Sequence, residues 1–337
     1  MVSEDQLIER VCREFPSTLR RAQRGAGLKG LGLRVGIGDD AAVLRPGAGA
    51  ELVVTTDAFL ENVHFLRKVH PAKAIGYKAL ARATSDLAAM GARSRYFFLT
   101  LGLPDACTGI WLNDFLAGMA RAARRFGLIL AGGDTSQYPS IVVSLTVLGE
   151  TDRGKAILRS GARPGDLLCV SGRLGEAELG LRLILRKLHK RKRWTRLFKK
   201  QFYPEPRLAL GQWLSAHRCA TSMIDTSDGL STDLGHICKA SGVGAIVWAP
   251  KIPKVRVPAE LQRVGFDPLD LALHGGEDYE LLFTVPKKLA ARLPQHLGDI
   301  PTTAIGEITQ EKKVLLVDAN GQSKPLQAKG WDPFRRR

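Results

Sequence analysis

The sequence has little cysteine and lacks the paired cysteines of common metal and redox motifs. Only five cysteines occur in 337 residues, they are widely spread, and none forms a C-x-x-C pair. This pattern argues against both a disulfide framework and a zinc site. We expect buried thiols instead, because free cysteine often packs as a small hydrophobic residue. The residues are Cys12, Cys107, Cys169, Cys219 and Cys238.

Long apolar runs are also missing. No run reaches the roughly 18 residues of a membrane-spanning helix, and the acidic segment Met1–Leu7 has no apolar core of a signal peptide. The composition, 45% hydrophobic and 25% charged, is that of a soluble globular protein. We therefore expect a cytoplasmic protein without a membrane partner.

The motifs of several enzyme classes are absent. There is no G-x-S-x-G motif and no cysteine/histidine pair that argues for a covalent nucleophile, so no residue is assigned that role. The Gly-rich stretch Arg20–Gly32 lacks the Gly-Lys-Ser/Thr ending of a P-loop. We interpret it as a loop, and a phosphate cradle stays an alternative.

Acidic residues are missing from one strongly basic segment. Ten Lys or Arg residues and no acid lie between Arg182 and Lys200, which is over half of the formal net charge of +17. A nucleic-acid surface is one interpretation. A solvated basic face is the interpretation that we favour, because such runs are often only solvated.

Acidic residues gather instead at six separated corners, each with Gly, Ser or Thr beside it. Several of these corners follow apolar runs that read as strands, and together they suggest one shared task. They are Gly38-Asp39-Asp40, Thr55-Thr56-Asp57, Ser85-Asp86, Gly132-Gly133-Asp134, Asp225-Thr226-Ser227-Asp228-Gly229 and Gly275-Gly276-Glu277-Asp278.

Carboxylates with neighbouring hydroxyls are the ligands that Mg²⁺ prefers. Phosphoryl transfer requires mainly positioning and charge neutralisation, so this inventory fits it better than glycoside hydrolysis, which needs two carboxylates. Structural roles compete at single positions. Asp86 could be a buried hydrogen-bonding residue, and Asp228 could cap the helix that follows it.

The predicted elements indicate an α+β protein with two domains, 1–150 and 151–337. Strands mix with helices without strict βαβ repetition in the first domain. The second domain should contain strands over 167–171, 221–224, 243–247, 279–285 and 313–317.

The corners, taken in order, closely resemble thiamine-monophosphate kinase, a family in the group of aminoimidazole-ribonucleotide synthetase and selenophosphate synthetase. Further matching segments are His64-Phe65, Leu87–Ala92, Thr135, Arg159–Ala162 and Tyr279–Leu281. The match spans nearly the whole chain. The resemblance implies ATP-dependent phosphorylation of thiamine monophosphate to the diphosphate with several Mg²⁺ ions. It also implies a homodimer in which the N-terminal domain pairs its sheet with the partner subunit, and a C-terminal α+β sandwich domain.

The resemblance also implies roles for individual residues. Those similar to the family's metal ligands are Asp40, Thr55, Thr56, Asp57, Asp86, Asp134, Asp225 and Asp228. Those matching positions that contact ATP are Gly133, Asp134, Arg159 and Ser227. Those matching positions that hold the thiamine end are His64, Glu277 and Trp331.

Residue by residue, plainer interpretations stay open. His64 could be a packed histidine, Trp331 a packing anchor and Glu277 a solvated loop residue. Asn62 stands where the family usually has Gly, which Asn tolerates in a left-handed conformation. Two other functions stay as alternatives: a different ATP-dependent synthetase of the same group, and a polyanion-binding protein that has lost catalysis.

Overall fold

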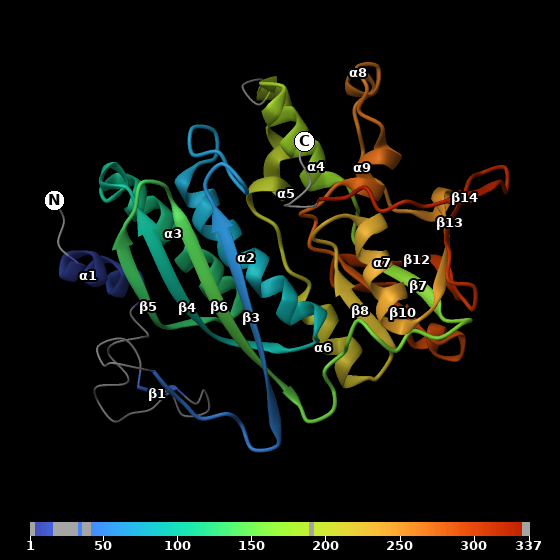
Figure 1. The fold of residues 1–337 in the computed structure, drawn as a ribbon, viewed down its shortest axis with the longest axis horizontal. Helices are drawn as coiled ribbons and strands as arrows, with labels where there is room; N and C mark the ends of the chain where they lie inside the picture. The colour runs from blue at the N-terminus through green and yellow to red at the C-terminus, as the bar shows by residue number, and fades with distance from the viewer. Residues whose placement is uncertain (1–3, 16–32, 36–41, 189–191, 332–337) are drawn as a thin grey trace. The chain divides into compact units, whose positions relative to one another are not determined.

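The computed structural model describes residues 4–15, 33–35, 42–188 and 192–331 (Figure 1). The chain divides into two compact units, of which the first comprises Met1–Leu87 and Ala92–Gly154. The second comprises Ala88–Gly91 and Lys155–Arg337. Sequence reasoning sets the boundary after residue 150, but strand β6 (Val142–Asp152) continues through that position.

A four-stranded sheet in the order β3-β6-β4-β5 forms the centre of the first unit. Strand β3 (Ala50–Leu60) and strand β4 (Arg93–Leu103) each pair antiparallel with β6, whereas β5 (Ile129–Gln137) pairs parallel with β4. Helices α2 (Ala72–Ala89) and α3 (Ile110–Phe126) lie against one face of this sheet (Figure 1).

Two acidic corners of this unit, around Asp57 and Asp134, lie inside strands, and the prediction that these two follow strand ends is wrong. Strand β3 runs past Asp57 to Leu60, and β5 runs past Asp134 to Gln137. The reason is the long partner β6, which pairs with β3 along its whole length from Ala50 to Leu60. An acid can occupy a strand when its side chain is not sealed from water, because it then avoids most of the desolvation cost.

Two glycines bring α2 and α3 into backbone contact. A Cβ atom on Gly76 would lie 2.0 Å from the carbonyl oxygen of Phe115, and one on Gly118 would lie 2.0 Å from that of Lys73. A side chain at either position would force the helices apart. Glycine is therefore required at both positions for this helix packing.

An eight-stranded sheet forms the centre of the second unit, in the order β14-β13-β9-β12-β7-β10-β8 with β11 paired to β12. Only the β13–β9 pair among these ladders is parallel. The strands are β7 (Leu167–Ser171), β8 (Ser222–Asp225), β9 (Gly244–Trp248), β10 (Leu281–Val285), β11 (His296–Leu297), β12 (Ile300–Thr309), β13 (Val314–Val317) and β14 (Ser323–Pro325).

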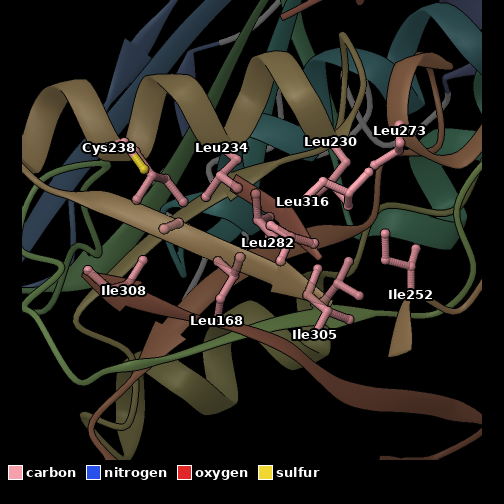
Figure 2. Close-up of a cluster of buried hydrophobic side chains, with 14 of the residues drawn as sticks. Leu168, Leu230, Leu234, Cys238, Ile252, Leu273, Leu282, Ile305, Ile308 and Leu316 are labelled. Carbon is pink, nitrogen blue, oxygen red and sulfur yellow. The ribbon is translucent and has the colours of Figure 1, made fainter. Parts of the chain in front are cut away.

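Both faces of this second sheet are buried. Figure 2 shows Leu230, Leu234 and Cys238 of helix α7 (Leu230–Ser241) packed over strand residues that include Leu282. The neighbouring residues of the same strands point to the other face, where they form a second cluster with helix α6 (Leu208–Ala216). Because successive strand residues point to opposite faces, near-continuous apolar strands are required here.

The remaining elements are short and mostly connect the two sheets' strands. They are α1 (Glu4–Glu14), β1 (Leu33–Val35), β2 (Val43–Leu44), α4 (Glu176–Leu185), α5 (Lys199–Phe202), α8 (Ala259–Gln262), α9 (Pro268–His274) and 3₁₀ turns at Asp105–Cys107, Lys192–Phe198, Ala249–Lys251 and Lys287–Arg292.

The predicted α+β class is confirmed as a mixed fold with two principal sheets. All five cysteines are buried free thiols, as expected. Burial raises the pKa of Cys169 to about 12. Within the described ranges, no helix is both long and apolar enough to cross a membrane.

Candidate active site

In the first unit, three predicted ligands take part in contacts between β3 and α2. The hydroxyl of Thr55 donates to Oδ2 of Asp86. Nε of Arg82 donates to Oδ2 of Asp57 over 2.8 Å. Both carboxylates are half-buried. The alternative that Asp86 is a hydrogen-bonding residue is thus compatible with a ligand role, because a carboxylate has lone pairs to spare.

The spacing of these contacts follows from elementary geometry. Arg82 and Asp86 are four residues apart on a helix, about 6 Å, and Thr55 and Asp57 are two residues apart on a strand, about 6.6 Å. The two intervals match, so both contacts form when the helix lies along the strand. Asp57 and Asp86 thereby occupy diagonal corners of this group of four residues.

Other predicted ligands of this unit lie elsewhere. The hydroxyl of Thr56 lies 3.2 Å from that of Thr146 on β6, on the sheet face opposite to Thr55, because neighbouring strand residues alternate. Asp134 is exposed, and its Oδ1 accepts from the backbone N–H of Thr135 over 2.8 Å. At Gly133 a Cβ atom would lie 2.0 Å from the carbonyl oxygen of Leu99.

Asp40 and the Gly-rich stretch 20–32 lie outside the described residues. Among the residues that are described, no group of three or more His, Cys, Asp or Glu side chains is arranged to hold a metal ion.

His64 belongs to the turn that follows β3. Its Nδ1 accepts from the backbone N–H of Leu60 over 3.0 Å, and its ring stacks on Phe59 with centroids 5.7 Å apart. Asn62 has φ 66°, which is the left-handed conformation that the sequence requires of it. The turn therefore forms without the glycine usual in the family.

In the second unit, the segments around Asp225 and Glu277 continue one β-ladder beyond its strands. Asp225 pairs with Leu281 at the end of the β8–β10 ladder. Beyond that pair, the N–H of Glu277 donates to the carbonyl of Ser227 over 2.8 Å. The ladder thus places Ser227 and Glu277, fifty residues apart in sequence, directly against each other.

Trp331 is brought to the same place by the backbone. Its N–H donates to the carbonyl of Asp228 over 3.0 Å. A Cβ atom on the preceding Gly330 would lie 1.9 Å from that carbonyl oxygen, so only glycine allows this approach. Four predicted site residues, Ser227, Asp228, Glu277 and Trp331, therefore meet in the second unit.

A buried carboxylate that sequence reasoning missed lies under this loop. Oδ2 of Asp233 accepts from the N–H groups of Gly229, over 2.9 Å, and Asp228, over 3.3 Å. Burial, together with the nearby carboxylates of Asp225 and Asp228, holds the pKa of Asp233 well above its usual range. Helix α7 begins at Leu230, and its N-cap position is taken by Gly229, the residue after Asp228.

Arg159 follows a residue that pairs with the beginning of β8. The carbonyl of its neighbour Leu158 accepts from the N–H of Met223, near the beginning of β8, whereas Asp225 ends that strand. The Arg159 side chain is exposed.

Two further acids of the Glu277 segment have structural partners. Glu280 is fully buried and contacts Lys200, Arg207 and Ser171. Burial raises the pKa of its carboxyl, but the charges of Lys200 and Arg207 outweigh that effect and lower the pKa to about 2. Asp278 accepts from the N–H groups of Gly175 and Ala177 at the start of α4.

Part of the basic segment is therefore neutralised within the fold. Besides Lys200, Arg182 pairs with Glu178 over 2.7 Å and Arg193 pairs with Glu260 over 3.0 Å. The count of charges in the sequence overstates the charge that this segment offers to a polyanion.

The fold and the sequence match define the class of this protein. Residues 38–151 match the family model described as AIR synthase related protein, N-terminal domain. Thiamine-monophosphate kinase of Escherichia coli O157:H7 is 38% identical over 329 residues, which cover 96% of this chain and 98% of the relative. The chain belongs to the thiamine-monophosphate kinase family.

Solved structures support the same relationship. Thiamine-monophosphate kinase from Stenotrophomonas maltophilia K279a is 36% identical, with a TM-score of 0.80, over 96% of this chain and 98% of that one. AaThiL, complexed with AMPPCP and TMP, is 30% identical, with a TM-score of 0.74, over 98% of this chain and 96% of that one.

Proposed function

We propose that this protein phosphorylates thiamine monophosphate to thiamine diphosphate by direct transfer of the γ-phosphate of ATP. The family membership supports the reaction, and the related complex with AMPPCP and TMP supports the pair of substrates. Residues that match ATP-contacting positions are Gly133, Asp134, Arg159 and Ser227. Those that match the thiamine end are His64, Glu277 and Trp331.

The observation that carries the proposal is the meeting of Ser227, Asp228, Glu277 and Trp331. Backbone hydrogen bonds tie these three distant segments together. Segments that bring together an aromatic residue and acidic residues suit a cationic thiazolium ring, because both kinds of side chain attract positive charge. Asp225 and Asp228 lie close to Ser227 in the sequence, and their two carboxylates could hold a cation that bridges to a nucleotide phosphate.

Magnesium ions would bind to the acidic residues of both units. The donors are carboxylate and hydroxyl oxygens, which fit Mg²⁺ better than a softer metal. In the second unit, the pKa of Asp233 is raised by burial and by the carboxylates of Asp225 and Asp228, so a cation there would relieve the repulsion among these acids. When bound, Mg²⁺ would neutralise phosphate charge, with Asp57 and Asp86 as ligands in the first unit.

A homodimer built on the first unit is the proposed assembly. Strand β3 lies at an edge of its sheet and exposes Leu52 by 45% and Val54 by 58%. Apolar side chains on an open sheet face favour burial against another copy. Sedimentation equilibrium should give twice the chain mass, and a monomer at micromolar concentration would contradict the assembly.

The reaction is tested by incubating the protein with Mg-ATP and thiamine monophosphate and measuring thiamine diphosphate. Free thiamine in place of the monophosphate is the control and should yield no product. ATP turnover without thiamine diphosphate would favour another synthetase of the same group. Neither turnover nor product, with salt-dependent nucleic-acid binding, would favour the polyanion alternative.

A further inference from the structure

Helix α5, at the end of the basic segment, contacts both ends of the loop that carries Glu277. Lys200 pairs with Glu280, and the next residue, Gln201, donates from Nε2 to Oε2 of Glu277 over 3.1 Å. A short element distant in sequence therefore holds two carboxylates of this loop.

The loop needs such support because its backbone is unfavourable. Glu277 has φ 66° and Tyr279 has φ 51°, both in the left-handed region that non-glycine residues rarely adopt. Conformations of this kind persist only where surrounding contacts enforce them, and they gather at functional sites. The ion pairs of Glu280 fix one end of the loop, and Gln201 acts on the side chain at the other.

Gln201 is a costly residue for packing alone. Its side chain is 1% exposed and lies against Gly180, where a Cβ atom would come within 2.8 Å of it. Its Oε1 is buried without a hydrogen-bond partner among the described residues. An apolar side chain of similar size would avoid that loss of stability, because an unpaired buried acceptor is unfavourable. The amide is thus oriented by its bond to Glu277.

We propose that Gln201 is a positioning and specificity-determining residue, which holds the Glu277 carboxylate in the orientation that receives the cationic thiamine end of the substrate. This inference rests on the proposed function, because it takes Glu277 as a substrate contact. It gives the last turn of the basic segment a part in recognition of thiamine monophosphate rather than of nucleic acid.

The test compares Gln201→Leu and Gln201→Glu with the wild-type enzyme. Leu removes the donor, and Glu keeps the shape but places a second acceptor against Glu277. The KM for thiamine monophosphate and its Kd without nucleotide should rise about tenfold or more, the size expected for a lost hydrogen bond to a charged group. The KM for ATP should stay within about twofold.

Gln262→Leu is the matched control. Its Nε2 donates to the carbonyl of Val257 over 2.7 Å in the same unit, so it also loses an amide hydrogen bond. It should leave both KM values unchanged. Thermal melts of all variants report folding, and Gln201→Leu carries the test if Gln201→Glu does not fold, because a second buried carboxylate is the more costly change.

The outcomes separate the two proposals. A wild-type protein that neither binds nor phosphorylates thiamine monophosphate overturns the proposed function and this inference with it. An active wild type with Gln201 variants whose substrate KM and Kd equal the wild-type values overturns the inference alone. Equal rises in both KM values, or failure of both variants to fold, would show that Gln201 only maintains the fold.

Discussion

The acids of the two units differ in what lies against them. In the first unit, Asp57 contacts a cation, Arg82, and Asp86 accepts from a neutral hydroxyl. In the second unit, burial and the nearby carboxylates of Asp225 and Asp228 raise the pKa of Asp233. The half-buried Asp57 and Asp86 are thus compensated by side chains, whereas the buried Asp233 accepts from two backbone N–H groups and has a raised pKa.

The strongest test of the comparison is Asp57→Asn. The change removes a charge but keeps the shape and the contact with Arg82, so the fold should be retained. Turnover should fall by about 100-fold or more, because electrostatic stabilisation of the transferring phosphoryl group is lost. Steady-state assays with circular dichroism as the folding control measure both effects. Near-normal rates at saturating Mg²⁺ would show that Asp57 is structural. We expect the same loss for Asp134→Asn.

In the second unit, Glu280→Gln should act on stability rather than on chemistry. The substitution leaves Lys200 and Arg207 buried without their counter-charge. Breaking a buried ion pair in this way costs about 3–5 kcal/mol of the free energy of unfolding. Urea denaturation measures the change. Lys287→Met, which breaks an exposed pair with Glu307, is the control and should cost below about 1 kcal/mol. Equal losses would refute the distinction between buried and exposed pairs.

The smallest effect is expected for Asp278→Asn, as a change in pH dependence. Burial, only partly offset by Lys200 and by two backbone N–H groups, raises the pKa of Asp278 to about 7. The folded protein therefore keeps a proton that the unfolded chain releases between about pH 4 and 7. The contribution of Asp278 to stability should be lost as pH rises through this window.

Thermal melts across that pH range give the measurement. The wild-type protein should lose stability with rising pH more steeply than Asp278→Asn, which cannot release a proton there. Asp267→Asn is a comparison variant, because that exposed carboxylate caps helix α9 by accepting from Leu269. Parallel curves for the wild type and Asp278→Asn would show that Asp278 does not titrate in this window.

Elements with strong local signals were predictable from the sequence. The predicted bounds of β7 coincide with the structure, because a short apolar run after the turn residues Pro164-Gly165-Asp166 marks it. Strand β12 and helix α9 were missed. Residues Ile300–Thr309 lack clear alternation, and β12 is stabilised by its two neighbours β7 and β9 rather than by its own pattern.

The candidate site was predictable as a set of residues and not as a set of contacts. The family motifs single out Thr55 and Thr56 together, yet strand alternation turns their hydroxyls to opposite faces. Asp233 and Gln201 carry no motif of their own, because their importance arises from a hydrogen bond to a distant segment. Such partners become visible only once the chain has folded.

The glycine contact between α2 and α3 has a consequence for the interpretation of mutational scans. Helix α2 carries Arg82 and Asp86, so its packing against α3 determines the positions of those side chains. A methyl group added at Gly118 would push α2 away from α3 without contacting any of the acidic residues. An unbiased screen for inactive variants should therefore recover Gly76 and Gly118 alongside the ligands, although neither has a functional group to contribute.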